Sequence, residues 1–281
     1  PNTSIRADAT GANGHGGSII TVAEGDLRAH GPCSAGGGPA RGNGGSIDPS
    51  GTNVDLTGTR VDAAAPGGTA GLWLIDPFDI SISHGTAAGT LPTLPFVPLA
   101  NSIIQDGDIN AALNGGTSVT ITTGAPDPSS FAGSINFQTG VDIHVDSGTA
   151  PVTLRLEAQR DITAATGDTL IRGTTAPLSV EFAAGLSGGS GRIYYNGDML
   201  TNGGNISMSA LGGNFNGCTI CLVNSTIDTR VGGSDANAGG NVSLQAPQIT
   251  AAVGEGSIFT RAGVDLHGST IPPTARHGRN L

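Results

Sequence analysis

The stretch that decides the fold is GGNISMSA at 203–210, which GGNVSLQA at 239–246 repeats 36 residues later. In the first copy, Ile206, Met208 and Ala210 alternate with polar residues. Because successive side chains of a β-strand point to opposite faces, this alternation places apolar side chains on one face and polar ones on the other. Each copy therefore predicts a half-buried strand preceded by a glycine pair.

The same pattern recurs along the chain. Further glycine pairs followed by alternating strands are GGSIITV, GGSID and GGTSVTIT, at 16–22, 44–48 and 115–122. Alternation without the glycines continues at 141–145 and 152–156. A sandwich or barrel with Asn-Gly hairpins is the competing all-β architecture. Near-identical strands favour instead a parallel β-helix, in which equivalent segments stack on one another and glycines turn the corners.

The length of a coil sets the expected size of the rod. At roughly 20 residues per coil and about 4.8 Å per rung, we expect about 14 coils and a rod some 65 Å long. We expect a single domain over 1–281, interrupted by a surface excursion at 84–101. There Pro92, Pro95 and Pro98 stand three apart, as in polyproline II. The excursion is either a packed loop that covers apolar coil surface or a ligand for a partner.

The composition excludes several classes of function. The 281 residues include 47 Gly but only one Trp, two Tyr and seven Phe, and all 12 basic residues are Arg. Without Lys there is no Schiff-base chemistry and no P-loop lysine. A net charge of −10 argues against nucleic acid as a partner, and no apolar run is long enough to span a membrane. The chain starts at Pro1 without a signal segment, so we expect a processed product or an internal piece.

The single Trp lies in GTAGLWLIDPFDISIS at 68–83. Residues 72–75 are apolar on both faces of the expected strand, so one face meets the core and the other must be covered from outside. We expect Trp73, with Ile75, to plug the core where the rod changes cross-section. Pro77 ends the strand because proline cannot donate to a ladder. The alternative is an exposed Trp73 that serves as a carbohydrate platform.

This region resembles filamentous-haemagglutinin-like exoproteins, the large secreted partners of two-partner secretion systems. Their typical phrase, APGG–G–WLLDP–(D/N)I–I, is matched within GNGGSIDPSGTNVDLTGTRVDAAAPGGTAGLWLIDPFDISIS at 42–83. Residues 65–68 read APGG, 71–77 read GLWLIDP and 79–82 read DISI. The resemblance covers most of 4–250, and the WLIDP phrase is its most specific part.

The resemblance implies a right-handed parallel β-helix that is exported by a Gram-negative bacterium through an outer-membrane transporter. It implies a secreted, extracellular or cell-surface location, and a role in adhesion, in aggregation, or in presenting a distal toxin or binding tip. The expected partner is a host or neighbouring cell surface or a glycan. The family's N-terminal secretion domain has no copy here. We therefore expect a shaft segment, without catalysis of its own and without a cofactor.

Two acidic patterns are candidate cation sites. Asp142, His144 and Asp146 share the outward face of one expected strand, at a spacing that could grip a divalent cation, although most such rows are solvated polar faces. Asp106 and Asp108 are a weaker candidate for Ca²⁺, because the nonapeptide repeat of calcium β-rolls is absent.

The three cysteines offer one candidate disulfide, Cys218–Cys221. In an extended strand the two Cα atoms would lie about 10 Å apart, too far for a bridge. If the segment turns a corner, the sulfurs can meet, and export to an oxidising exterior favours the bond. Cys33 is expected to stay free.

The sequence is compatible with three hypotheses for the function. The first is a secreted structural or adhesive rod. The second is a β-helical polysaccharide hydrolase or lyase, for which Arg155 and Glu157 would share a face with Asp142 only if the coils register suitably. The third is a binding module that recruits a partner through its loop or its strand edges. Unpaired edges at the rod ends also predict self-association.

Overall fold

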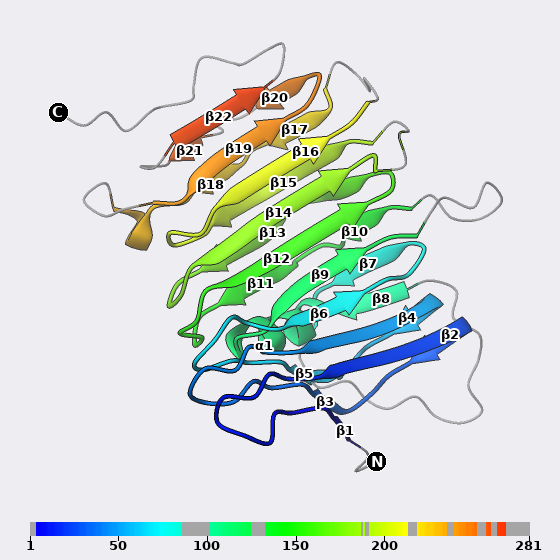
Figure 1. The fold of residues 1–281 in the computed structure, drawn as a ribbon. Helices are drawn as coiled ribbons and strands as arrows, with labels where there is room; N and C mark the ends of the chain where they lie inside the picture. Colours follow the sequence, from blue (N-terminus) through cyan, green and yellow to red (C-terminus); the bar gives the residue numbers. More distant parts are fainter. Residues whose placement is uncertain are drawn as a thin grey trace.

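The computed structural model shows the chain as a parallel β-solenoid whose strands stack from the N-terminal to the C-terminal end (Figure 1). Strands account for 52% of the structure and helix for 6%. The structure describes residues 4–85, 102–124, 133–186, 188, 191–212, 218–234, 239–251, 257–259 and 263–267, with side chains as far as residue 250. The expected excursion at 84–101 lies outside the described residues, except for His84 and Gly85.

The strands form three stacks along the solenoid axis. The first stack holds the strands that follow the glycine pairs. In spatial order it contains β2 (Ser18–Arg28), β4 (Ser46–Asp55), β6 (Leu72–Ile75), β9 (Ser118–Thr122), β12 (Val152–Ala158), β14 (Leu178–Ala184), β16 (Ile206–Ala210), β19 (Asn241–Gln245) and β22 (Gly263–His267). All ladders between these strands are parallel, and Ile206 lies in register between Val180 and Val242. The parallel solenoid predicted from the repeated phrase is confirmed.

The second stack departs from chain order at one place. It contains the C-terminal parts of β2 and β4, then β8 (Ser102–Gln105), β7 (Ile80–Ser83), β10 (Ile135–Phe137), the first parts of β13 (Ile162–Gly173) and β15 (Ile193–Leu200), β17 (Ile220–Val223) and β20 (Ile249–Ala251). After β7 the chain therefore returns by one rung, and β8 pairs between β4 and β7.

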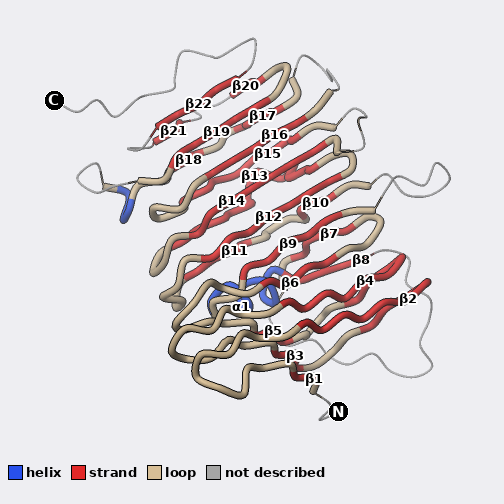
Figure 2. Tube along the Cα trace, in the orientation of Figure 1, coloured by secondary structure: helices blue, strands red, loops and turns tan. Residues whose placement is uncertain are grey.

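A helix interrupts the third stack (Figure 2). On one side of α1 (Asp106–Asn114) lie β1 (Ile5–Arg6), β3 (Pro32–Ser34) and β5 (Arg60–Asp62). On the other side lie β11 (Asp142–Val145), the C-terminal parts of β13 and β15, β18 (Thr226–Asp228) and β21 (Ser257–Phe259). A 3₁₀ turn at Val231–Gly233 follows β18 in the chain. The helix contacts both β5 and β11, so it occupies the place of a strand. No pattern in the sequence predicted this helix.

The solenoid has about 8 turns, fewer than the 14 coils expected. A full turn is longer than 20 residues because it contains three strands and three corners. Ser18 pairs with Ser46, and Val180 with Ile206, 28 and 26 residues further along the chain. The turn that includes β8 and α1 takes 46 residues, from Leu72 to Ser118.

Alternate side chains of the strands fill one continuous interior, made mostly of Ile, Leu, Val and Ala. Three aromatic rings meet within it, those of Phe137, Phe182 and Tyr195, with centroids 6.2 to 6.4 Å apart. The Tyr195 hydroxyl is buried and donates to the Asp198 carbonyl oxygen at 3.0 Å. Burial raises the pKa of Tyr195 well above its ordinary value, so it stays neutral.

The repeated glycine pairs are explained by the approach of one rung to the next. A Cβ atom on Gly240 would collide with the carbonyl oxygen of Gly204 on the preceding rung, and one on Gly204 would collide with that of Leu178. Gly203 has a φ of +94°, which disfavours any residue with a side chain.

Trp73 is fully buried between Ile47 and Val119 of the neighbouring rungs. Ile75 and Pro77 are buried as well. The predicted core position is therefore correct, and the carbohydrate-platform alternative is wrong for this side chain. At this level of the solenoid the stacks also change, because β8 and α1 are inserted beside β6 and β9.

Candidate functional site

A groove of about 390 Å³ lies on the outward face of the second stack. Strands β7, β10 and β13, with Arg192 just before β15, supply most of its lining. The lining residues are Asp79, Ile80, Ser81, Ser102, Ser134, Asn136, Asp161, Thr163 and Arg192. The groove is therefore a mainly polar surface spread over several successive rungs.

The register of the strands arranges the lining in two columns. Ser81, Asn136 and Thr163 are direct partners on neighbouring rungs, and their side chains point outward because Ile80, Ile135 and Ile162 fill the core. The second column lies two residues earlier on each rung. It consists of Asp79, Ser134, Asp161 and Arg192, on the same outward face.

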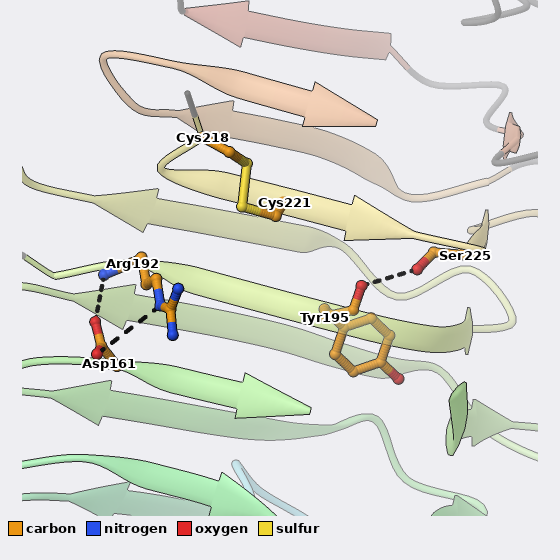
Figure 3. The surroundings of a disulfide bond; sticks show 6 residues. All are labelled: Asp161, Arg192, Tyr195, Cys218, Cys221 and Ser225. Atoms are coloured by element: carbon orange, nitrogen blue, oxygen red, sulfur yellow. Dashed lines mark hydrogen bonds and ion pairs between the residues drawn. A yellow bond between two sulfur atoms is a disulfide. The ribbon is translucent and has the colours of Figure 1, made fainter. Parts of the chain in front are cut away.

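Hydrogen bonds to the backbone hold both carboxylates of the groove. Asp79 Oδ1 accepts from the Ser134 N–H at 2.6 Å, and Asp161 Oδ1 accepts from the Arg192 N–H at 3.0 Å. The Arg192 side chain turns toward the same carboxylate, with Nε 3.9 Å from Asp161 Oδ2 (Figure 3). Each carboxylate therefore connects one rung to the next and is held in place by this contact.

The spacing of the two carboxylates limits the catalysis that they could support. Asp79 and Asp161 lie two rungs apart, which corresponds to about 9.6 Å between their backbones. A retaining glycosidase needs its carboxyl groups about 5 Å apart, and an inverting one about 6.5–9.5 Å. The backbone separation is therefore wide for a retaining pair and lies at the upper limit for an inverting pair.

The three residues predicted as a cation site do come together on the outward face of β11. His144 stands between its neighbours, with Nδ1 3.4 Å from Asp142 Oδ1 and Nε2 3.5 Å from Asp146 Oδ2. Arg172 of the next rung also binds Asp142, through Nε at 3.2 Å and Nη2 at 2.9 Å. Burial alone would raise the pKa of Asp142, but Arg172 and His144 outweigh it and lower the pKa below its ordinary value.

These contacts describe a row of neighbouring side chains, with Arg172 as the ion-pair partner of Asp142, rather than a set of metal ligands. Within the described part of the chain, no group of three or more His, Cys, Asp or Glu side chains has an arrangement that could hold a metal ion. The geometry at Asp142, His144 and Asp146 thus gives no support to the cation hypothesis.

Asp106 and Asp108, the weaker Ca²⁺ candidates, are buried at the start of α1 and bind neighbouring groups of the protein. Asp106 accepts hydrogen bonds from the N–H groups of Gly85 and Asp142, each at 2.9 Å. Asp108 accepts from the Gly58 N–H at 2.9 Å and from Arg60 Nη1 at 3.1 Å. Both carboxylates therefore attach α1 to the adjoining elements.

Cys218 and Cys221 form a disulfide, with their Cα atoms 5.7 Å apart (Figure 3). The segment turns into β17 instead of running extended, which is the geometry that brings the sulfurs together. Both residues are buried. Cys33 is free and half-buried, and burial raises the pKa of its thiol.

The acidic cluster considered for glycan cleavage does not form around Arg155. This residue lies on β12 in the first stack, whereas Asp142 lies on β11 in the third. Arg155 pairs instead with Glu157 of its own strand and with Glu181 of the next rung.

The groove was not predicted from the sequence, because its residues come from separate segments that only the register aligns. Single polar residues such as Ser81, Asn136 and Thr163 carry no local motif. Their alternation with buried isoleucines was the one available signal. No family model and no curated protein matches the chain. None of the helices in the described regions is long and apolar enough to cross a membrane.

Proposed function

We propose that this chain is a shaft segment of a secreted, cell-surface rod of the filamentous-haemagglutinin-like type, structural or adhesive and without catalysis of its own. The observation that carries the proposal is the parallel ladder of the first stack, which runs from β2 to β22 around one apolar interior. A hydrogen-bonded rung at every level makes a stiff spacer, which is what a surface rod requires.

The disulfide supports an extracellular location. Cys218 and Cys221 are paired, and disulfides persist in oxidising compartments but are rare in the cytosol. The resemblance around WLIDP at 73–77 supports the rest of the proposal: a right-handed solenoid, export through an outer-membrane transporter of a Gram-negative bacterium, and contact with a host or neighbouring cell surface or glycan.

The proposal is tested by locating the protein in the cells that produce it. Antibodies raised against the folded chain should label intact cells or the culture medium. The cells would be treated rapidly with an alkylating reagent, and the protein would then be unfolded in the presence of that reagent. Cys33 should be alkylated, whereas Cys218 and Cys221 should not, because their sulfurs are bonded to each other. Labelling only after permeabilisation, together with three alkylated cysteines, would refute the proposal.

Glycan cleavage is the second candidate, because the groove contains Asp79 and Asp161 on one face. Purified chain would be incubated with neutral and acidic oligosaccharides, and the products resolved by mass. Release of shorter products that is lost in Asp161→Asn but kept in a Glu181→Gln control would establish an enzyme. Oligosaccharides that remain intact after prolonged incubation would exclude cleavage of these substrates and favour the structural shaft.

A further inference from the structure

We propose that the groove on the second stack is a binding site for a neutral, hydroxyl-rich oligosaccharide that lies along the solenoid axis across β7, β10, β13 and β15. The inference rests on the proposed surface function and assigns one place and one ligand class to it. It requires binding only and no bond cleavage.

The polar part of this face has a definite beginning and end. Ser81, Asn136, Thr163 and Tyr194 are successive partners in register, one on each of four rungs. The rung before Ser81 presents Ile103, which is 39% exposed. The rung after Tyr194 presents Cys221, which is closed off by its disulfide. The polar window is thus bounded by an apolar side chain at one end and by a disulfide at the other.

The chemistry of the window suits sugar hydroxyls. Asn136 is exposed and offers both a donor and an acceptor, while Ser81 and Thr163 are partly exposed hydroxyls. The second column adds the carboxylates of Asp79 and Asp161, which their backbone hydrogen bonds hold in place. A hydroxyl can donate to a carboxylate or accept from an amide, so a polyhydroxylated ligand can satisfy both columns at once.

Tyr194 supplies an aromatic surface at one end of the window. Its side chain points outward, because its neighbour Tyr195 is fully buried in the core. Tyr194 is partly exposed and lies beside Thr163 in the ladder. An outward ring next to polar groups is an amphipathic surface on which the apolar face of a sugar can pack.

The size and charge of the window narrow the ligand further. Four rungs span about 14 Å along the axis, which is the length of a short oligosaccharide rather than of a single sugar. The lining contains two carboxylates and one guanidinium, and Arg160 beside it also approaches Asp161, with Nε 3.7 Å from Oδ2. The negative charge at this face therefore comes mainly from the chain as a whole, whose net charge is −10. Charge repulsion therefore disfavours polyanions, including nucleic acid and uronic-acid polymers.

The first stack shows what an outward face without this window looks like. At the equivalent rungs it places Arg155 between Glu157 and Glu181, so its charged groups pair with one another. The neighbouring rung presents Ser207 without an aromatic partner. The first stack therefore provides control positions in the same molecule.

The test measures binding of purified chain by titration calorimetry to tetramers of β-1,4-linked glucose, of β-1,4-linked N-acetylglucosamine and of α-1,4-linked galacturonic acid. We expect at least one neutral tetramer to bind and the galacturonate tetramer not to bind. Asn136→Ala and Thr163→Ala should each weaken binding about fivefold. Tyr194→Ala should weaken it by at least that factor, whereas Tyr194→Phe should retain it.

The controls are Asn241→Ala and Ser207→Ala, which remove exposed polar groups from the first stack and should leave the affinity unchanged. An unchanged circular dichroism spectrum and melting temperature would show that each variant folds. Equal binding by all groove variants would overturn the proposed site. Absence of binding to both neutral tetramers by a chain that labels the cell surface would overturn the ligand class while leaving the shaft function intact.

Discussion

At the scale of single residues, Trp73 carries much of the packing of its turn. It is the largest fully buried side chain, and its rung partners are Ile47 and Val119. Its indole N–H finds no acceptor among the described residues. The side chain therefore stabilises the core through its volume and apolar area, whereas its buried N–H without an acceptor carries a desolvation cost.

Trp73→Ala should lower the free energy of unfolding by about 3–5 kcal/mol, because it leaves a large cavity in a core that cannot collapse around it. Trp73→Phe should cost clearly less, since it keeps most of the ring and removes the unpaired N–H. Denaturant unfolding followed by circular dichroism measures both changes. Leu74→Ala, on the outward side of the same strand, is the control. A loss of unfolding free energy in Leu74→Ala as large as that in Trp73→Ala would contradict the role of Trp73 as the side chain that fills the core at this turn.

At the scale of elements, α1 replaces a strand by means of its side chains. Asp106, Asn110 and Asn114 lie four residues apart and so share one face of the helix. Their side-chain oxygens accept hydrogen bonds from the N–H groups of Asp142, His144 and Asp146, at 2.8 to 2.9 Å. These donors are alternate residues of the β11 edge, so the helix satisfies that edge as a strand would.

Asn114→Ala should destabilise the chain by about 1–3 kcal/mol, because its Oδ1 also accepts from the N–H groups of Ser147 and Gly148. Amide hydrogen exchange should accelerate at 146–148 and remain slow in β16. Asn114→Asp keeps the acceptor and should lose less stability. If the amide hydrogens at 146–148 exchanged equally fast in the Ala and Asp variants, the side-chain oxygen at position 114 would not be what holds this segment.

His84 links α1 to the segment before it through a hydrogen bond of 2.8 Å between Nδ1 and Asp106 Oδ2. This hydrogen bond and the charge of Asp106 raise the pKa of His84 above its ordinary value of 6.5. Because the folded pKa exceeds the unfolded one, the stability from this pair is present below pH 6.5. It is lost as the pH rises through the raised value.

The melting temperature of His84→Gln should therefore fall further below that of the unmodified chain at about pH 5.5 than at about pH 9. Titration of the imidazole by NMR should give a pKa above 6.5. Substitution of the distant His15 in the same way serves as the control. A difference in melting temperature that is constant with pH would argue against the pair.

At the scale of the whole molecule, the first stack leaves β2 with a single hydrogen-bonded neighbour, β4, among the described strands. Two apolar side chains stand exposed on that strand, Ile20 at 67% and Val22 at 71%. An unpaired edge beside exposed apolar groups is a surface on which another strand can pair.

We expect the isolated chain to sediment faster as its concentration rises, because copies pair through this edge. The double substitution Ile20→Lys with Val22→Lys should restore monomer-like sedimentation. Leu211→Lys, which changes an exposed apolar residue within the solenoid, should leave the association unchanged. A concentration-independent monomer for the unsubstituted chain would show that this edge does not associate.

Most of the fold could be predicted from local patterns in the sequence. Alternation in GGNISMSA predicts which face of β16 is buried, because a strand's side-chain period is fixed by its backbone. The glycine pairs predict close contact between rungs. Neither signal gives the number of turns, because corners and insertions between strands vary in length, as the 46-residue turn from Leu72 to Ser118 shows.

By itself, then, the sequence determined the parallel stacking, the apolar interior and the buried position of Trp73, all of which depend on the order of neighbouring residues. The tertiary structure alone decided the return of β8 between β4 and β7, the place of α1 in the third stack, and the groove that joins Asp79, Asn136 and Thr163. These features depend on the register between segments far apart in the chain. Register is set by how whole turns pack, and no short stretch of residues encodes it.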